Sequence, residues 1–336
     1  MAHAESIPKP LVSVIVPAYN RASTIAATLD TITSQTGWPF EILVIDDGSS
    51  DDTAAIARRH APQARVVVQE NQRRSAARNN GARLATGEFL YFFDSDDLME
   101  PEAIARLAAC LQAHPEAAVA YGSALEFVDD PTVAVPRMPQ CRKSGDLLSQ
   151  HLEQPFLIPI MAMVRREWFE RVGGMTTKLD YCEDYHFFLK ISAAGGEYQC
   201  IDGPAVARYR EYASSRIPGS IHMHGFVTAL RMIAADYGDR IPPESRLDYY
   251  RARSEAAYSR HLLREGQTRK AWATWLGSLD RCRTSFGTDV IMFVGSLVIP
   301  VRLLERVVYG SRRRIRDAWG WCLHQLGVGM KSVKTP

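Results

Sequence analysis

The fold is decided by three stretches, VSVIVPAYN at 12–20, ILVIDDGSSDDT at 42–53 and EFLYFFDSDD at 88–97, which each join an apolar run to a polar end. Runs of this kind, rich in β-branched and aromatic residues, are typical of strands buried on both faces. Helical patterns of about 10–15 residues separate them, and this alternation predicts an α/β fold with a doubly wound, mostly parallel sheet. The expected strands are 11–17, 40–45, 65–69 and 88–93, and the expected helices are 23–35, 51–60, 75–85 and 101–114.

Single residues indicate where these helices begin and end. Ser23 or Thr24 is expected to cap the first helix, because a hydroxyl oxygen can accept a bond from a free amide of the first turn. Gly87 is expected to end the third helix, and Pro101 to open the fourth as a first-turn proline. These boundaries therefore depend on side-chain chemistry as well as on hydrophobic periodicity.

The composition of the 336 residues is that of a globular protein, with 46% hydrophobic and 23% charged residues, and it excludes disordered and fibrous chains. Forty Lys and Arg against 38 Asp and Glu give a net charge of +2, which is too balanced to suggest a nucleic-acid partner. The six cysteines form no C-x-x-C pair, so we expect reduced thiols and no zinc site. Since neither a secretory signal nor a run of about 20 apolar residues is present, we expect a cytoplasmic protein.

Acidic and hydroxyl side chains follow three of the predicted strands, at the edge where ligands bind in such sheets. The sharpest cluster is Asp94-Ser95-Asp96-Asp97. One of its carboxylates could face a ribose hydroxyl while another binds Mg²⁺ or Mn²⁺, which prefer carboxylate and diphosphate oxygens. The alternative is that these acids only cap the helix that Pro101 opens.

Two further acid pairs carry the same kind of choice. Asp46-Asp47 could accept hydrogen bonds from a base or a ribose, or could form a tight turn with the following glycine. Glu183-Asp184 opens an amphipathic helix, where we expect the helix dipole to lower the pKa of an acid and so suit it to act as a base. Simple compensation of the dipole is the alternative there.

Arginines gather at the start of the third predicted helix, at Arg73, Arg74 and Arg78. A guanidinium group binds phosphate through two parallel hydrogen bonds, so the cluster could hold a diphosphate. A solvated helix face is the alternative.

The order of these motifs is more informative than any one of them. VSVIVPAYN, ILVIDDGSSDDT, SAARNNGARLATGEFLYFFDSDD at 75–97 and the Glu183-Asp184 pair together resemble family 2 glycosyltransferases with a GT-A fold, over about residues 12–215. The resemblance implies an inverting enzyme that moves a sugar from a nucleoside diphosphate, most often UDP, to an acceptor hydroxyl with Mn²⁺ or Mg²⁺ on the diphosphate. It implies a glycan or lipid-linked acceptor in cell-surface glycan, polysaccharide or glycoconjugate biosynthesis. Because the Gln-x-x-Arg-Trp motif of processive synthases is missing, we expect single transfers.

The resemblance also implies a role for each matching residue. Asp184 would be the catalytic base, with Glu183 beside it to help place the acceptor. Asp96 or Asp97 would hold the cation. The nucleotide and its ribose would lie against Pro17, Tyr19, Asn20, Asp46, Asp47, Arg78, Asp94 and Ser95. The chain departs from the family at Arg73, where glycine is frequent, and the added bulk would narrow the base side or the acceptor side.

We expect an N-terminal tail at 1–10, a GT-A domain at 11–220 and a helical C-terminal region at 221–336. Within the GT-A domain, residues 11–130 would bind the nucleotide sugar and residues 131–220 the acceptor. In the C-terminal region, the apolar run 290–299 precedes an arginine-rich segment. This pattern is typical of an element lying on an anionic membrane surface, at the inner face of the cell membrane, or of a core helix followed by a solvated basic helix. A catalytically degenerate sugar-nucleotide-binding protein or scaffold is the alternative function, against which the intact set of acids argues.

Overall fold

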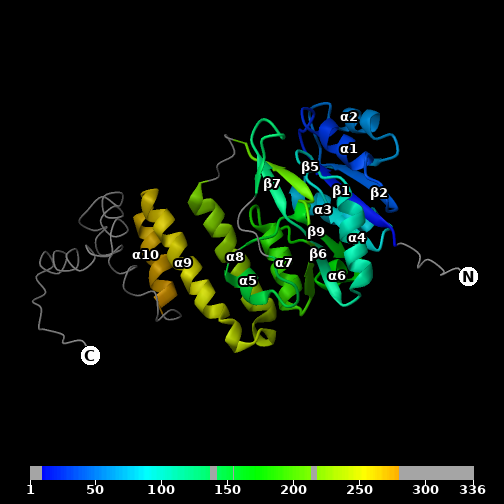
Figure 1. The fold of residues 1–336 in the computed structure, drawn as a ribbon. Helices are drawn as coiled ribbons and strands as arrows, with labels where there is room; N and C mark the ends of the chain where they lie inside the picture. Colours follow the sequence, from blue (N-terminus) through cyan, green and yellow to red (C-terminus); the bar gives the residue numbers. More distant parts are fainter. Residues whose placement is uncertain (1–9, 137–141, 154, 213–217, 280–336) are drawn as a thin grey trace, which may run out of the picture. The chain divides into compact units, whose positions relative to one another are not determined.

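The computed structural model of the protein describes residues 10–136, 142–153, 155–212 and 218–279. The chain divides into two units (Figure 1). The first holds the residues before 218 together with 228–245, and the second holds 218–227 together with the residues from 246 onward. The expected tail, the apolar run 290–299 and the arginines after it lie outside the described residues, apart from Pro10 at the end of the tail.

The first unit is built on a seven-stranded sheet with the order β10-β6-β9-β4-β1-β2-β3. Its strands are β1 Val12–Ala18, β2 Phe40–Asp46, β3 Arg65–Val68, β4 Phe89–Phe92, β6 Ala117–Tyr121, β9 Ala162–Arg165 and β10 Glu197–Cys200. Neighbours from β4 to β3 are parallel, as are β10 and β6, whereas β9 runs antiparallel to both β4 and β6. The predicted α/β class with a mostly parallel sheet is confirmed, and β9 is the strand that interrupts the parallel order.

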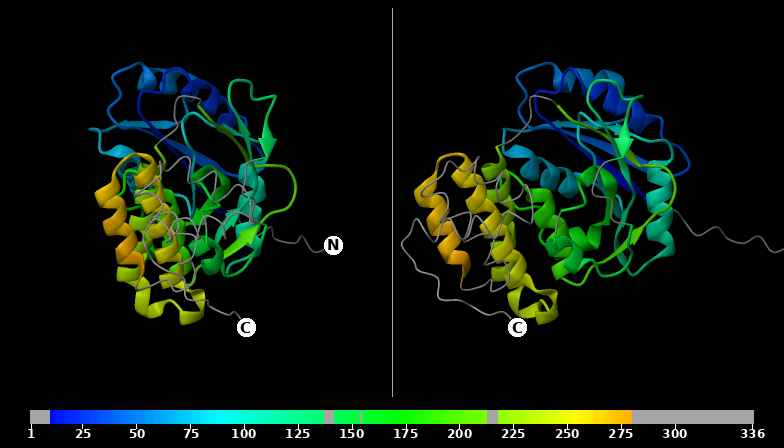
Figure 2. Two further views of the ribbon diagram at one scale, coloured as in Figure 1. Left: turned by 90° about the vertical axis from the view of Figure 1, so that its left-hand side faces the viewer. Right: turned by 60° about the vertical axis from the view of Figure 1, so that its left-hand side comes forward.

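Helices cover both faces of this sheet because the strand order reverses along the chain. Right-handed crossovers from β1 to β2 and from β2 to β3 put α1 and α2 on one face, and the return from β3 to β4 puts α3 on the other (Figure 2). The helices of this part are α1 Ile25–Thr33, α2 Thr53–His60, α3 Arg73–Leu84, α4 Ala103–Ala113, α5 Leu148–Glu153, α6 Arg166–Arg171 and α7 Glu183–Ala193, with the 3-10 turn η1 Pro159–Met161. Helix α3 lies so close to β1 that a Cβ at Gly81 would be 2.4 Å from the Ile15 side chain.

Two residues that were expected to begin or end a helix have other contacts in the structure. Thr24 stands at the N-cap position of α1, but its hydroxyl makes no capping bond and donates instead to the Ser95 carbonyl at 3.1 Å. The prediction that Gly87 ends the third helix is wrong, because α3 ends at Leu84 with an extended residue after it. Gly87 instead lies against β1, where a Cβ would be 2.6 Å from the Leu11 carbonyl oxygen, so the close approach of two backbones requires the glycine.

A smaller sheet with the order β5-β11-β7-β8 lies beside the acid cluster that follows β4. Its strands are β5 Leu98–Met99, β7 Ala124–Phe127, β8 Val135–Pro136 and β11 Ala207–Arg210. β11 pairs antiparallel with β5, with Ala207 opposite Met99. This pairing brings the end of β11 next to the acid cluster from more than a hundred residues away.

The described part of the second unit is helical. Helix α8, Gly219–Tyr237, contributes residues to both units. The 3-10 turns η2 Gly238–Arg240 and η3 Pro243–Ser245 belong to the first unit, and α9 Leu247–Arg264 and α10 Thr268–Leu279 belong to the second. Helices α9 and α10 pack on each other around an apolar cluster that includes Tyr258, Leu262 and Trp275. Of the helices in the described part of the chain, none has the length and apolarity needed to cross a membrane.

Candidate functional site

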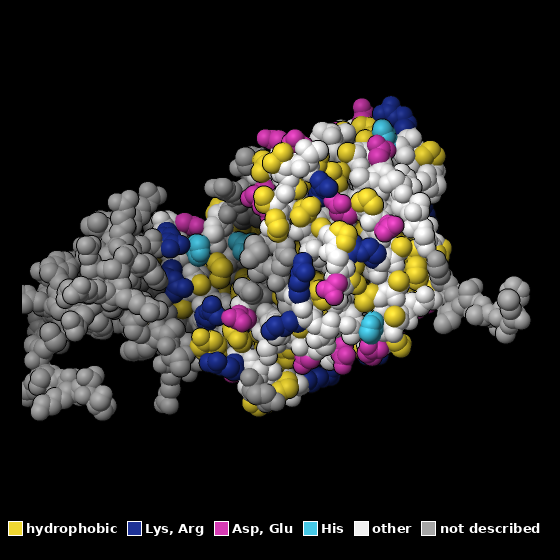
Figure 3. All heavy atoms as spheres, viewed as in Figure 1, with side chains coloured by type: hydrophobic (Ala, Val, Ile, Leu, Met, Phe, Trp, Pro, Cys, Tyr) yellow, Lys and Arg dark blue, Asp and Glu magenta, His cyan; other side chains and the backbone are white. Residues whose placement is uncertain are grey.

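Surface charge alone does not locate a site. On the face of the molecule drawn in Figure 3, the coloured basic and acidic side chains are interspersed, in keeping with the small net charge. The search therefore starts from the sheet. Because β1, β2 and β4 are parallel and paired in register, with Ala18 opposite Asp46 and Ile15 opposite Phe92, their carboxyl ends meet at one edge.

The loop after β1 is fastened to the loop after β2. Pro17 is buried within β1, whereas the Tyr19 side chain is 48% exposed beyond the end of the strand. Asn20 has a positive φ of 51°, its amide donates to Ser49 Oγ at 2.9 Å, and its side-chain oxygen accepts the Ser50 amide at 2.9 Å. These bonds hold the exposed Tyr19 ring at the edge of the sheet, available to contact a ligand.

Both acids that follow β2 are buried and hydrogen-bonded to the backbone. Asp46 Oδ1 accepts the Ser49 amide at 3.0 Å across a turn in which Gly48 has a φ of +77°. Asp47 Oδ1 accepts Gln69 Nε2 at 2.7 Å and the Gln72 amide at 3.0 Å. The tight-turn alternative thus describes Asp46 well, while Asp47 connects the end of β2 to the start of α3.

Residues 94–97, which follow β4, alternate between half-buried and buried positions, so Asp97 lies apart from Asp94 and Asp96. Asp94 and Asp96 are half-buried, whereas Ser95 and Asp97 are buried at 4% and 1% exposure. Asp97 Oδ1 accepts the Arg210 amide at 2.7 Å, which fixes this turn to β11. The capping alternative is excluded for this cluster, because β5 intervenes and α4 begins only at Ala103.

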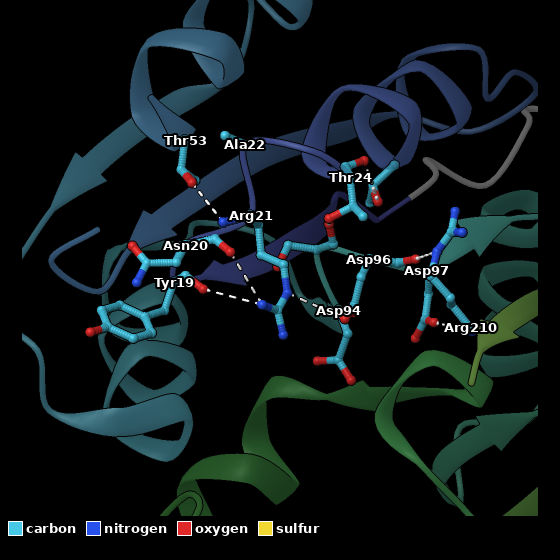
Figure 4. A network of polar contacts seen from close by, with 12 residues as sticks. Tyr19, Asn20, Arg21, Ala22, Thr24, Thr53, Asp94, Asp96, Asp97 and Arg210 are labelled. Carbon is cyan, nitrogen blue, oxygen red and sulfur yellow. Dashed lines mark hydrogen bonds and ion pairs between the residues drawn. The ribbon is translucent and has the colours of Figure 1, made fainter. Parts of the chain in front are cut away.

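Asp96 faces Arg21, whose Nε lies 3.3 Å from Asp96 Oδ2 (Figure 4). Burial and the charge of Asp94 raise the pKa of Asp96, although Arg21 and a hydrogen bond from Tyr212 act in the opposite direction. Arg21, Arg210 and Tyr212 were not among the expected site residues. Arg21 could have been found because it follows the first motif directly, but no local signal connects residues 210–212 to this turn.

The Asp94 and Asp96 carboxylates fit a divalent cation. They supply oxygen donors, and a cation would relieve the repulsion that raises the pKa of Asp96. Over residues 10–136, 142–153, 155–212 and 218–279, no group of three or more His, Cys, Asp or Glu side chains is placed to hold a metal ion. A cation here would therefore need further oxygens from a substrate and from water.

A buried arginine connects this cluster to the second acid pair. Arg78 of α3 is 3% exposed, and it donates from Nη2 to Asp94 Oδ1 at 2.6 Å and from Nη1 to Glu183 Oε1 at 3.0 Å. The two carboxylates raise the pKa of Arg78, so it stays charged. Arg74, one turn earlier on α3, places its Nε 3.6 Å from the same Glu183 oxygen. Glu183 is only 2% exposed and has two cationic neighbours.

Asp184 differs from Glu183 in its surroundings. Burial and the charge of Glu183 raise the pKa of Asp184 to about 6, although Arg78 and Arg74 partly oppose this. The expectation that the dipole of α7 lowers the pKa of this acid is wrong for Asp184, because burial and a like charge outweigh the dipole and the Tyr185 amide that Asp184 Oδ1 accepts at 2.7 Å. A carboxylate that titrates near neutral pH is suited to accept a proton.

Arg73, which departs from the expected glycine, does take the backbone conformation that favours glycine, with a φ of +70°. Its guanidinium forms an ion pair with Asp180, in the loop that leads into α7. The bulk of Arg73 is therefore directed toward the loop before the acid pair.

The sequence was compared with known protein families and with proteins of related sequence. The model of glycosyl transferase family 2 matches residues 13–173. An uncharacterized glycosyltransferase of Haemophilus influenzae is 31% identical over 184 residues, which are 54% of this chain and 62% of that protein. A PGL/p-HBAD biosynthesis glycosyltransferase of Mycobacterium tuberculosis is 36% identical over 121 residues, which are 34% of this chain and 47% of that protein. The chain thus spans less than two thirds of the length of either relative.

Two solved structures share the fold. Staphylococcus aureus TarS 1–349, solved in complex with UDP, has a TM-score of 0.60 at 20% identity, covering 94% of this chain and 91% of that one. The mannosyltransferase PcManGT from Pyrobaculum calidifontis, solved with GDP-Man and Mn²⁺, has a TM-score of 0.54 at 24% identity, covering 95% of this chain and 88% of that one. The predicted GT-A fold is confirmed by these likenesses.

Proposed function

We propose a function from the premise that the chain, through residues 13–173, belongs to glycosyltransferase family 2. It transfers a sugar from a nucleoside diphosphate donor to a hydroxyl group of an acceptor. The observation that carries this proposal is the contact of one buried arginine, Arg78, with both Asp94 and Glu183. Arg78 thereby connects two pairs of acids. Asp94 and Asp96 are suited to bind a nucleotide and a cation, and Glu183 and Asp184 are suited to proton transfer.

On the donor side, Tyr19, Asn20 and Asp47 surround the base, with Pro17 and Asp46 shaping the edge behind them. The exposure of the Tyr19 ring supports a stacking role, because an aromatic face can cover a base. Asp94 accepts a hydrogen bond from the ribose, and Ser95 holds the loop through its carbonyl. UDP is the nucleotide that we favour, since TarS was solved with UDP and with UDP-GlcNAc.

Asp96, with Asp94 beside it, holds Mn²⁺ or Mg²⁺. Asp97 is a weaker candidate, because one of its oxygens accepts the Arg210 amide. When bound, the cation neutralises charge on the departing diphosphate. The presence of Mn²⁺ in the PcManGT structure supports a divalent cation in this fold.

On the acceptor side, Asp184 takes the proton from the acceptor hydroxyl while the oxygen of that hydroxyl forms a bond to the anomeric carbon. The bond from that carbon to the diphosphate breaks with its electron pair, so the nucleoside diphosphate leaves and the configuration inverts. Proton transfer of this kind contributes typically about 10²–10⁴-fold. Glu183 is bonded to Arg78 and positions Asp184. The mycobacterial relative is named for PGL/p-HBAD biosynthesis, and we propose a glycan or glycoconjugate acceptor here.

The test is a thermal-shift screen of UDP, GDP and their sugars, each with and without Mn²⁺ or Mg²⁺, followed by detection of the released diphosphate. A nucleotide at 100 times its Kd should add about 2.7 kcal/mol to the free energy of unfolding. A cation-dependent shift with UDP, together with release of UDP from one UDP-sugar, is the expected result. A shift without turnover in any acceptor mixture would favour the degenerate binding protein, and no shift with any nucleotide would contradict the proposal.

A further inference from the structure

A cavity of about 300 Å³ opens between the first turn of α3 and the loop that leads into α7. Its lining includes Arg73, Arg74 and Ser75 from α3, and Thr177 and Asp180 from the loop. The residues that the family resemblance places against the nucleotide do not line the cavity, although Arg73 and Arg74 belong to the arginine cluster that could hold a diphosphate. The cavity lies next to the proposed donor site, since the amide of Gln72, which lines it, donates to Asp47, and Arg74 connects it to the acid pair.

The start of α3, like those of α1, α2 and α4, has no side chain that caps it and no acid in its first turn. Gln72 at the N-cap makes no side-chain capping bond, and the first turn holds no acid. The first amides of a helix have no partner within the helix, and they attract anions. This feature alone defines no site, because water can satisfy such amides.

Ser75 supplies an independent observation. Its side chain is only 2% exposed, and its Oγ finds no hydrogen-bond partner among the residues that the structure describes. Buried hydroxyls nearly always have a partner, and Ser75 is one of the residues that line the cavity. A ligand with hydrogen-bond acceptors at this place would complete the bonding of Ser75.

Two guanidinium groups select the charge of that ligand. Arg74 is 56% exposed and, within the described chain, makes one ion pair and no side-chain hydrogen bond, so it has donors to spare. Arg73 is 68% exposed and pairs with Asp180, which is 56% exposed. Exposed ion pairs are weak, so an anion in the cavity can compete with Asp180 for Arg73. Guanidinium donors at a helix N-terminus suit a phosphate group, although the Arg73 amide already donates to Asn71 Oδ1 at 3.3 Å.

We propose that this cavity binds a phosphate group carried by the acceptor, so that the enzyme acts on a phosphate-bearing glycan or lipid. The inference rests on the proposed function. The loop that lines the cavity continues into Glu183 and Asp184, and Arg74 contacts Glu183, so a phosphate held here brings its carrier to the residue that takes the acceptor proton. The phosphate anchors the acceptor, while Asp184 selects the hydroxyl.

The test uses the full chain and sn-glycerol 3-phosphate as the probe, titrated calorimetrically at constant ionic strength. Wild type is measured alone and with saturating UDP and Mg²⁺. The variants are Arg74→Gln, Ser75→Ala and, as a matched control from the other end of the same helix, Arg83→Gln. Arg83 is exposed and bonds Asn80, so its loss removes the same charge without touching the cavity. Each variant is first shown to be folded by its thermal transition.

We expect saturable binding that Arg74→Gln weakens at least about tenfold and Ser75→Ala about threefold, with Arg83→Gln within about twofold of wild type. UDP should leave the affinity for the probe unchanged. Absence of saturable binding, equal affinity in all variants, or displacement of the probe by UDP would each overturn the proposal. The UDP titration is read separately, so failure of the nucleotide to bind would contradict the proposed function, while the variants still report on the cavity.

Discussion

Replacing Asp184 by Asn should abolish transfer and at the same time stabilise the protein. The carboxylate is half-buried in the folded state next to Glu183, and both its burial and the neighbouring charge oppose its ionisation. An amide has nearly the same shape, and its oxygen can still accept the Tyr185 amide that Asp184 Oδ1 accepts at 2.7 Å. The substitution therefore removes the unfavourable charge while the local contacts remain.

The magnitude follows from the difference between the two pKa values of this group. In the folded state the pKa is about 6 and the ordinary value is 3.8, so the shift is about two pH units. Each unit corresponds to about 1.4 kcal/mol, which gives at most about 3 kcal/mol of stabilisation above pH 7, where the carboxylate is charged in both states. As the pH falls below 6, the folded protein takes up a proton before the unfolded chain does. Wild type then regains stability, and the advantage of Asp184→Asn should disappear near pH 4.

Thermal and urea unfolding at pH 8, 7, 6 and 5 measure this difference, with Asp202→Asn as the control because Asp202 is an exposed carboxylate. At pH 8 the Tm of Asp184→Asn should exceed that of wild type by roughly 4–8 °C, and the control should stay within about 0.5 kcal/mol of wild type. Turnover should fall by at least about 10²-fold while UDP binding is kept. A variant no more stable than wild type at pH 8 would refute the assignment of a strained base, as would near wild-type turnover.

The other contacts of the site make equally direct predictions. Asp96→Asn should lose most of the Mn²⁺-dependent part of the UDP affinity, at least about tenfold in calorimetry; an unchanged affinity would remove Asp96 from the metal site. Arg78→Gln leaves Asp94 and Glu183 without their shared buried cation and should cost about 3–5 kcal/mol in urea unfolding, part of which Arg78→Gln with Glu183→Gln should recover. Glu183→Gln removes a repulsive charge and should shift the acidic limb of the kcat/KM profile to lower pH; a shift to higher pH would contradict this cause. Burial and Lys190 lower the pKa of His186 to about 4, below the usual 6.5, so stability should fall by up to about 1.4 kcal/mol per pH unit from 6.5 to 4, and His186→Gln should flatten that fall in urea titrations.

The sequence could predict the parallel half of the sheet because its signals are local. β1 and β2 are short apolar runs that end in polar motifs, and parallel strands bring their carboxyl ends to one edge. That geometry alone gathers Tyr19, Asp47 and Asp96. In contrast, β6 has the sequence AAVAY and β9 the sequence AMVR, and runs this short and alanine-rich carry little strand signal. They were not among the expected strands.

Pairings between distant segments account for what the sequence left open. β5 has two residues, too few for any periodicity, and it is a strand only because β11 lies beside it. This pairing is why we propose Asp96 rather than Asp97 as the cation ligand, because the Arg210 amide from β11 bonds Asp97 and leaves Asp96 facing Arg21. The sequence shows that arginine replaces the frequent glycine at position 73. The direction of the Arg73 side chain, however, depends on its ion pair with Asp180, which lies in another loop.

In the proposed mechanism, the charge balance around Arg78 accounts for the different roles of the adjacent acids Glu183 and Asp184. One buried guanidinium meets Asp94 on the donor side and Glu183 on the acceptor side, and Arg74 adds a second contact to Glu183. These contacts pair Asp94 and Glu183 with cations, whereas burial and the charge of Glu183 raise the pKa of Asp184 against the opposing effect of Arg78 and Arg74. A site with one more cation would hold Asp184 as a permanent carboxylate and a poorer base near neutral pH. A site without Glu183 would lose both the repulsion and the anchor that keeps Arg78 between the two halves. In this proposal the two acids differ because Glu183 accepts the hydrogen bond from Arg78, while Asp184 has the raised pKa that a base needs.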